Sequence, residues 1–266
     1  MTYQAKNISF SYGGKKILNK ASLEIQPGEI VTILGPNGCG KTTLIKILSS
    51  EIKPDKGDVS IENKKINEIK PEELARIRSV VSQKTNLTFG FSVREVIEMG
   101  MNPYNQKTTK ECSKDIDDIL EEYELKKFKN KNYLKLSAGE QQRVNIARSI
   151  IQLNQNNANQ PKYLLMDEPT SSLDIHFQIK LAKNLKKLSN KNVGIALVLH
   201  DINMALSLSD RIVLFSSKET INFLNKPFKK KLPGSLDVLE QSFKSKFEII
   251  SNQKKIFVTP FVQEDN

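Results

Sequence analysis

Apolar and polar residues alternate in two stretches near the start of the chain, residues 2–10 and 16–25. A period of two is typical of strands that bury one face. Tyr12-Gly13-Gly14 lies between the stretches, and glycine readily adopts the backbone angles of a tight turn. The sequence therefore predicts two strands joined by a turn.

Later apolar runs do not alternate, which is typical of strands buried on both faces of a parallel sheet. These runs lie at residues 30–34, 79–83, 163–166, 194–199 and 211–215, and one further alternating strand is expected at 58–61. Helical spacing separates them, with helices expected at residues 43–48, 72–77, 175–189 and 202–209. Buried strands that alternate with helices are typical of α/β proteins.

The pattern changes between about residues 84 and 135, where strand-like runs disappear. Ser92 and Glu95 have the spacing of a capping box at a helix start. Further on, Ile116, Ile119, Leu120 and Tyr123 share one face of a helix. We therefore predict an inserted helical segment, whose charged residues form a solvated face.

The stretch Leu136-Ser137-Ala138-Gly139-Glu140-Gln141-Gln142-Arg143-Val144 begins another helical pattern. Ser137 is a good N-cap, and Glu140 follows three residues later. A helix N-terminus preceded by small residues can accept phosphate oxygens, and the alternative is a plain capped helix. The polar, asparagine-rich run from Gln152 to Gln160, closed by Pro161, predicts a surface loop.

Composition narrows the class of protein. The chain has 266 residues, of which 38% are hydrophobic, enough for one large α/β domain. There is no apolar run long enough to span a membrane, and the N-terminus lacks the apolar core of a signal peptide, so we expect a cytoplasmic protein. Cys39 and Cys112 are the only cysteines, which does not indicate a disulfide framework.

The net charge of +11 suggests nucleic acid, an anionic membrane face or acidic partners. However, only six of the 41 basic residues are arginines, and the lysines are scattered. No basic and aromatic residues alternate in the way that single-stranded nucleic-acid sites require. A solvated lysine surface is the favoured interpretation.

The most specific motif is Gly35-Pro36-Asn37-Gly38-Cys39-Gly40-Lys41-Thr42-Thr43. It matches G-x-x-x-x-G-K-[ST], a phosphate-binding loop, and lies between a predicted strand and a predicted helix. Its glycines let the backbone N–H groups approach a phosphate, and the helix N-terminus adds a partial positive charge. Lys41 is expected to contact the β- and γ-phosphates, and Thr42 to bind Mg²⁺.

Polar residues end three of the predicted core strands, where ligands bind in open parallel sheets. Asp167 and Glu168 follow the strand at 163–166, and suit a Mg²⁺ contact and the polarisation of an attacking water. Gln83 and His200 end two other strands. Each has a plain alternative, a solvated loop glutamine and a structural histidine. Tyr12 is either a base-stacking aromatic or a half-buried residue at a strand end.

With these motifs in this order, the chain resembles the nucleotide-binding subunits of ATP-binding cassette (ABC) transporters over roughly residues 2–250. The phosphate loop resembles Walker A, Leu136 to Glu140 the L-S-G-G-Q signature, and Leu164 to Glu168 Walker B. Gln83 fits the Q-loop, Ser172-Leu173-Asp174 the D-loop and His200 the switch histidine. The signature departs from the family pattern at Ala138, in place of glycine, and at Glu140, in place of glutamine.

The resemblance implies a P-loop NTPase (RecA-like) core with an N-terminal antiparallel β subdomain. Residues 1–266 would form a single ABC ATPase domain, with a helical subdomain at 84–135 and a C-terminal extension at 217–266. It implies catalytic roles for Glu168, His200 and Gln83, and Mg²⁺ contacts from Thr42, Gln83 and Asp167. The implied ATP contacts are Tyr12, Gly35, Pro36, Asn37, Gly38, Cys39, Gly40, Lys41, Thr42, Thr43, Ser137, Gly139 and Asp167.

The family's mechanism implies a homodimer, because each site joins Walker A of one subunit to the signature of another. Two ATP molecules would close the dimer, and two permease subunits would receive that motion at the cytoplasmic face of the inner membrane. A periplasmic or surface substrate-binding protein would act indirectly, and no nucleic acid is expected.

The closest likeness is to importers of metal chelates: haem, ferric siderophores and cobalamin. The polar insert at 152–161, Leu199 to Asn203 and the tail around 236–249 resemble haem-importer ATPases, although the insert is equally well a variable surface loop. The basic residues at 226–231 either lie near lipid or are solvated. Two alternatives stay open, an ABC ATPase acting on ribosomes or DNA, and an inactive cassette.

Overall fold

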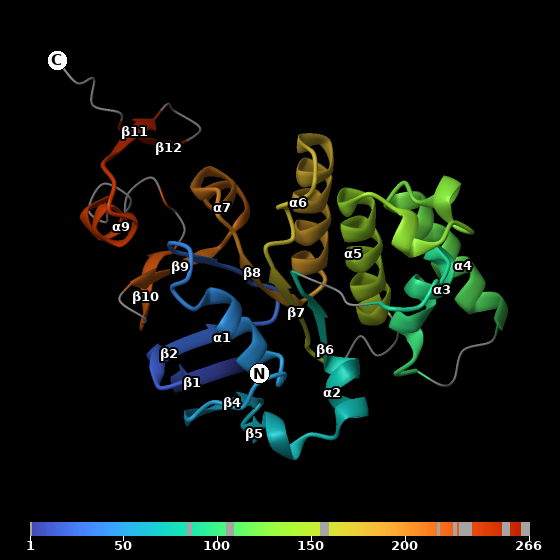
Figure 1. The fold of residues 1–266 in the computed structure, drawn as a ribbon, viewed down its shortest axis with the longest axis horizontal. Coiled ribbons are helices and arrows are strands. Elements are labelled where there is room, and N and C mark those ends of the chain that lie inside the picture. The colour runs from blue at the N-terminus through green and yellow to red at the C-terminus, as the bar shows by residue number, and fades with distance from the viewer. Residues whose placement is uncertain are drawn as a thin grey trace.

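The computed structural model describes residues 2–83, 87–104, 109–154, 160–216, 219–225, 228, 236–251 and 256–261. Figure 1 shows α1 beside the N-terminal strands, helices α5, α6 and α7 standing over the central strands, and α9 with β11 and β12 set at one end. The α/β fold expected from the sequence is confirmed.

The central sheet has six strands in the order β10-β9-β3-β8-β7-β6. Five of them run parallel, and β10 pairs antiparallel with β9 at one edge. The strands span β3 (Ile30–Leu34), β6 (Arg78–Val81), β7 (Lys162–Asp167), β8 (Val193–Val198), β9 (Arg211–Ser216) and β10 (Glu219–Asn225). Their carboxyl ends therefore meet along one edge of the sheet, where the site lies.

A second, antiparallel sheet has the strand order β2-β1-β4-β5. Its strands are β1 (Tyr3–Tyr12), β2 (Lys15–Ile25), β4 (Lys56–Ile61) and the short β5 (Lys64–Lys65). The predicted pair at the N-terminus is confirmed as an antiparallel hairpin. Helix α1 (Lys41–Leu48) contributes four buried residues to the apolar core that this sheet shares with the central one.

Alternate residues of the central strands belong to two different cores. In β7, Tyr163 and Leu165 pack with α1 and the antiparallel sheet, whereas Leu164 and Met166 pack with the helices on the opposite face. This explains why these strands are apolar at nearly every position, since neither face meets water.

The helices on that opposite face are α5 (Ala138–Asn154), α6 (Ile175–Asn190) and α7 (Ile202–Leu208), which stand over the sheet in Figure 1. Helix α2 (Pro71–Ile77) precedes β6, and a 3₁₀ turn at Ile66–Glu68 precedes α2. Helix α5 runs two residues beyond the predicted start of the loop at Gln152. The Gln152 side chain is held there because its Nε2 donates to the Ala75 and Arg78 carbonyls, at 2.6 and 3.1 Å.

Between β6 and α5, the described residues contain helices and short turns. They are α3 (Val93–Glu98), α4 (Thr109–Glu122) and 3₁₀ turns at Met99–Met101, Lys126–Phe128 and Tyr133–Lys135. The predicted capping box is confirmed, since Ser92 and Glu95 exchange hydrogen bonds at the start of α3. The bounds 84–135 of a helical subdomain stay a prediction.

The C-terminal part contains elements that the sequence analysis did not anticipate. Besides β10 they are α9 (Leu236–Phe243) and the hairpin β11 (Phe247–Ser251) with β12 (Ile256–Pro260). The hairpin is attached to α7, because the Asn203 side chain bonds both the N–H and the carbonyl of Val258, at 2.8 and 3.0 Å. The four lysines between residues 226 and 231 lie outside the described residues, and Phe228 is the residue of that segment that the structure describes.

Within the described part of the chain, none of the helices has the length and apolar content that a bilayer crossing requires.

Candidate active site

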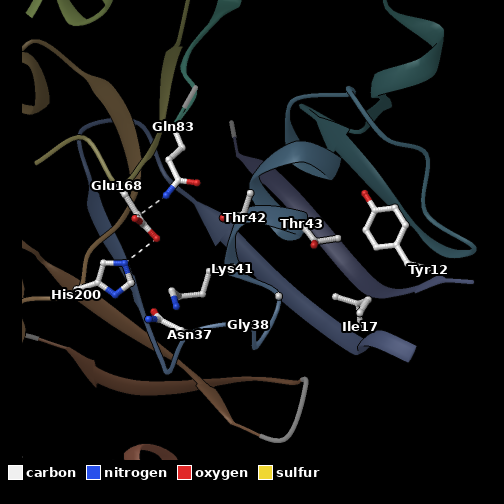
Figure 2. Close-up of a pocket in the computed structure, with 11 residues that line it drawn as sticks. Tyr12, Ile17, Asn37, Gly38, Lys41, Thr42, Thr43, Gln83, Glu168 and His200 are labelled. Carbon is white, nitrogen blue, oxygen red and sulfur yellow. Dashed lines mark hydrogen bonds and ion pairs between the residues drawn. The ribbon is translucent and has the colours of Figure 1, made fainter. Parts of the chain in front are cut away.

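A cavity of about 400 Å³ opens at the carboxyl edge of the central sheet, beside the start of α1. Figure 2 shows that its walls come from the β1–β2 hairpin, the loop before α1, and the ends of three core strands. The lining residues are Tyr12, Ile17, Asn37, Gly38, Gly40, Lys41, Thr42, Thr43, Gln83, Glu168 and His200.

The loop before α1 needs glycine at both ends. Gly35 has φ +153°, and a Cβ there would lie 2.8 Å from Cβ of Phe215. Gly40 is the N-cap of α1 with φ +111°, and its Cβ would lie 2.7 Å from Leu18 Cδ2. No side chain caps α1, so its first N–H groups have no side-chain partner from the protein. This arrangement suits an anionic ligand such as a phosphate.

Lys41 lies inside this loop and is only 5% exposed. Its Nζ donates hydrogen bonds of 2.8 Å to the carbonyls of Gly35 and Pro36. The ammonium is therefore held within the loop that would surround a phosphate. Cys39 also lies in the loop, and burial raises the pKa of its thiol. Because its thiol is kept neutral, its contribution to anion binding comes from the backbone.

Thr42 and Asp167 meet across the start of α1. Thr42 Oγ1 donates to Asp167 Oδ1 at 3.2 Å, and Asp167 is 3% exposed at the end of β7. Burial raises the pKa of Asp167, while the Thr42 hydroxyl lowers it and the Glu168 charge raises it. A hydroxyl and a carboxylate oxygen side by side are hard ligands of the kind that Mg²⁺ prefers, so these residues fit that ion.

Glu168 receives contacts on both oxygens. His200 Nε2 lies 2.6 Å from Oε1, and Gln83 Nε2 donates to Oε2 at 2.9 Å (Figure 2). The three residues follow β7, β8 and β6, which are neighbours in the sheet. Strand β6 ends at Val81, two residues earlier than predicted, so Gln83 lies in a bend beyond it. Glu168 itself has φ +50°, a left-handed conformation that is uncommon outside glycine.

Tyr12 and Ile17 form the opposite side of the cavity, on the β1–β2 hairpin (Figure 2). Tyr12 is 51% exposed, and its ring meets that of Phe10 edge-on at 4.7 Å. It is thus both a strand-end residue and a cavity residue, and base stacking stays a prediction. Ile17 was missed in the sequence, where two adjacent apolar residues, Ile17 and Leu18, interrupt the alternation.

Six predicted site residues do not line this cavity. Gly35, Pro36 and Cys39 belong to the phosphate loop, and Asp167 contacts Thr42. Among the described residues, Ser137 and Gly139 form no hydrogen bond or ion pair with that loop. Ser137 is the exposed cap of α5, where its Oγ accepts from Glu140 N at 3.3 Å and its own N–H donates to Glu140 Oε2 at 2.8 Å. The structure of one chain thus gathers Gln83, Glu168 and His200 at the phosphate loop and leaves Ser137 and Gly139 apart from it.

Residues 18–171 match the family model described as ABC transporter. Among curated relatives, the hemin import ATP-binding protein HmuV of Escherichia coli O157:H7 is 39% identical over 218 residues, which cover 82% of this chain and 84% of that protein.

The fold is also similar to that of solved cassettes. The dimeric structure of MJ0796, a bacterial ABC transporter cassette, matches with a TM-score of 0.72 and 31% identity, over 84% of this chain and 99% of that one. A post-hydrolysis state of MJ0796 bound to ADP and Pi matches with the same TM-score, at 30% identity and with the same coverage.

Proposed function

The chain belongs to the ABC transporter family, and from this premise we propose that it is the subunit whose ATP hydrolysis powers import of haem through a membrane permease. As a member of this family it binds ATP and is an ATPase. The observation that carries the proposal is the convergence of Gln83, Glu168 and His200 on the phosphate loop. The choice of cargo rests on the likeness to a hemin import protein, with ferric siderophores and cobalamin as related alternatives.

The triphosphate of ATP would bind at the N-terminus of α1, whose N–H groups lack a side-chain cap. Lys41 would exchange a loop carbonyl for a phosphate oxygen. Thr42, Asp167 and Gln83 would hold Mg²⁺, which when bound neutralises charge on the phosphate oxygens. Tyr12, at the far side of the cavity, would stack on the base.

Glu168 then has a defined task. Its carboxylate polarises the water that attacks the γ-phosphorus, and the bond to the bridging oxygen breaks to release ADP and phosphate. His200 and Gln83 hold the two carboxylate oxygens, so that Glu168 is oriented before the water arrives. The left-handed backbone at Glu168 helps to aim this carboxylate toward the cavity.

The site is completed by a second copy of the chain. Ser137 and Gly139 lie outside the cavity of their own subunit, so the signature is free to contact the γ-phosphate held by a partner. A dimeric cassette at 31% identity supports this arrangement. ATP would close the homodimer, and hydrolysis would reopen it.

The permease partner would lie at the cytoplasmic face of the membrane, where this chain associates peripherally. An exposed aromatic residue six positions after Gln83 supports a docking surface there, because Phe89 is 71% exposed and its ring centre lies 6.3 Å from that of Phe91. Two permease subunits would receive the closing motion there. A periplasmic or surface substrate-binding protein would deliver the chelate from the other side.

The substitution Glu168→Gln tests the mechanism. It keeps the shape and loses the base, so the variant should bind ATP, accumulate as a closed dimer and lose most steady-state hydrolysis. Size-exclusion chromatography with ATP and a phosphate-release assay measure the two effects. Full hydrolysis by this variant would contradict the role given to Glu168.

Cargo is tested with the co-purified membrane complex in proteoliposomes. Haem should stimulate ATP hydrolysis and enter the vesicles, while cobalamin and a ferric siderophore should do neither. Co-purification with ribosomes or DNA, in place of a membrane partner, would instead support a non-transport ATPase.

A further inference from the structure

Two loops of this chain are built to the same plan. Each starts with a tight turn, in which Leu136 N bonds the Tyr133 carbonyl at 3.1 Å and Leu173 N bonds the Thr170 carbonyl at 3.2 Å. Both leucines are buried, with 7% and 8% of their surface exposed. Each loop then leads directly into the N-terminus of a long helix, α5 or α6.

The helix starts also correspond. Ser137 caps α5 and Asp174 caps α6, each by accepting the N–H three residues later. A glutamine follows each cap by four residues. Gln141 N and Gln178 N each bond the carbonyl of their own cap residue at 2.9 Å.

The glutamine side chains then reach back over the turns. Gln141 Nε2 donates to the carbonyls of Tyr133 and Leu136, at 3.2 and 3.3 Å. Gln178 Nε2 donates to the carbonyls of Thr170 and Leu173, at 3.3 and 3.0 Å. The carbonyls lie eight and five residues before the glutamine in both cases. We call these two arrangements the glutamine clamps.

The clamped loops touch one another. A Cβ on Gly139 would lie 2.7 Å from the Ser172 carbonyl oxygen, so only glycine allows this approach. The buried Gln142, on α5, donates from Nε2 to the Pro169 carbonyl at 3.2 Å. Pro169 directly follows Glu168, so the signature helix is tied to the segment that carries the catalytic carboxylate. Helices α5 and α6 stand side by side in Figure 1. Arg143 Cζ, on α5, lies 4.1 Å from the centre of the Phe177 ring, on α6.

We propose that Gln141 and Gln178 are a matched pair of positioning residues for ATP hydrolysis, which hold the signature loop and the D-loop in the shape needed to receive a second subunit. This proposal rests on the dimeric function proposed above. The exposed residues Ser137 and Ser172 lie on the outside of these loops. Because each loop is fixed before the subunits meet, closure loses less conformational entropy.

Substitution by methionine tests each clamp. Methionine keeps the length of glutamine and removes both donors, so two carbonyls lose a partner. In a Glu168→Gln background, Gln141→Met and Gln178→Met should each weaken ATP-driven dimerisation about tenfold, and the double variant should weaken it more than either alone. The ATP affinity of the monomer, measured at low protein concentration, should stay within about twofold because the phosphate loop is untouched.

Three further measurements test whether the clamps act on dimer formation. Gln178→Glu should lose at least as much as Gln178→Met, since its carboxylate faces two carbonyl oxygens. Gln241→Met, on the exposed surface of α9, should change nothing. At high protein concentration the turnover of Gln178→Met, in the wild-type Glu168 background, should recover, since the deficit lies in dimer formation.

Unchanged dimerisation in both methionine variants would overturn the proposal. So would a fall in ATP affinity that follows a fall in melting temperature, because a general structural role would produce it. If Glu168→Gln alone forms no dimer with ATP, the dimeric function itself fails, which separates that failure from a failure of the clamps.

Discussion

The N-termini of α1 and α5 are built in opposite ways. The N-cap of α1 is Gly40, which has a left-handed conformation and offers no side chain as a cap. The residue that caps α5 is Ser137, which forms a capping box with Glu140. The first terminus has a buried lysine beside it, and the second has an exposed serine.

This difference fits the proposed division between a site that one chain forms by itself and a surface that acts only against a second chain. The α1 terminus leaves N–H groups without side-chain partners and lies over a core, so it is ready for an anion. The α5 terminus pairs two of its N–H groups, those of Ser137 and Glu140, with its own side chains, which stabilises the helix start in the single chain. Only the first should therefore govern the ATP affinity of a monomer.

The largest effect is expected from a substitution at the N-terminus of α1. Lys41→Ala removes the buried cation, and ATP affinity or turnover should fall by about a hundredfold. Isothermal titration and a phosphate-release assay measure the two quantities. The matched control is Lys46→Ala on the same helix, whose half-buried side chain pairs with Glu51 at 3.3 Å and does not line the cavity. If Lys41→Ala left both quantities unchanged, Lys41 would have no part in the site.

A smaller effect is expected from a substitution that disturbs the N-terminus of α5 and leaves that of α1 intact. Gly139→Ala places a methyl group against the Ser172 carbonyl, so one of the two loops must move. Dimerisation of the Glu168→Gln protein should weaken about tenfold, a cost typical of overpacking. The ATP affinity of the monomer is the internal control. Equal losses in both measurements would show that the two termini are not separable in this way.

The smallest effect is expected from removing the negative charge at the N-terminus of α5. The Ser137 N–H holds the pKa of Glu140 below its usual range, so a full negative charge lies at this helix start. Glu140→Gln keeps a capping box and removes the charge, and a partner's triphosphate should then bind a few-fold more tightly, by about 0.3–1 kcal/mol.

Dimerisation measured at low and high salt checks this prediction, because the gain should disappear when the charges are screened. Glu140→Ala is the control, since it removes the cap together with the charge and should destabilise α5. No gain for Glu140→Gln at low salt would contradict the prediction.

Local signals were sufficient for most of the fold. Period-two alternation and apolar runs predicted the hairpin and all five parallel strands, because those patterns depend on residues close in sequence. The later elements β10, α9 and β11–β12 were missed. Their patterns are short, and the hairpin is held in place by Asn203, 55 residues before Val258.

The residues of the candidate site also fall into those that local sequence predicted and those that only packing brings to the cavity. The phosphate loop is contiguous, and its glycines, Lys41 and Thr42 were predicted from spacing alone. Ile17 could not be predicted as a cavity residue, because it reaches the loop only through packing against Gly40. The contact between Gln83 and Glu168 joins residues 85 positions apart, which no local pattern encodes.

By itself, therefore, the sequence determined the phosphate loop, the strand-end residues and the capped start of α5. Only the tertiary structure decided that Gln83 and His200 contact the two oxygens of Glu168, and that the two glutamine clamps share one geometry. The physical reason is that backbone turns and periodicity depend on neighbouring residues. Hydrogen bonds between side chains on different strands and helices depend on how the whole chain packs.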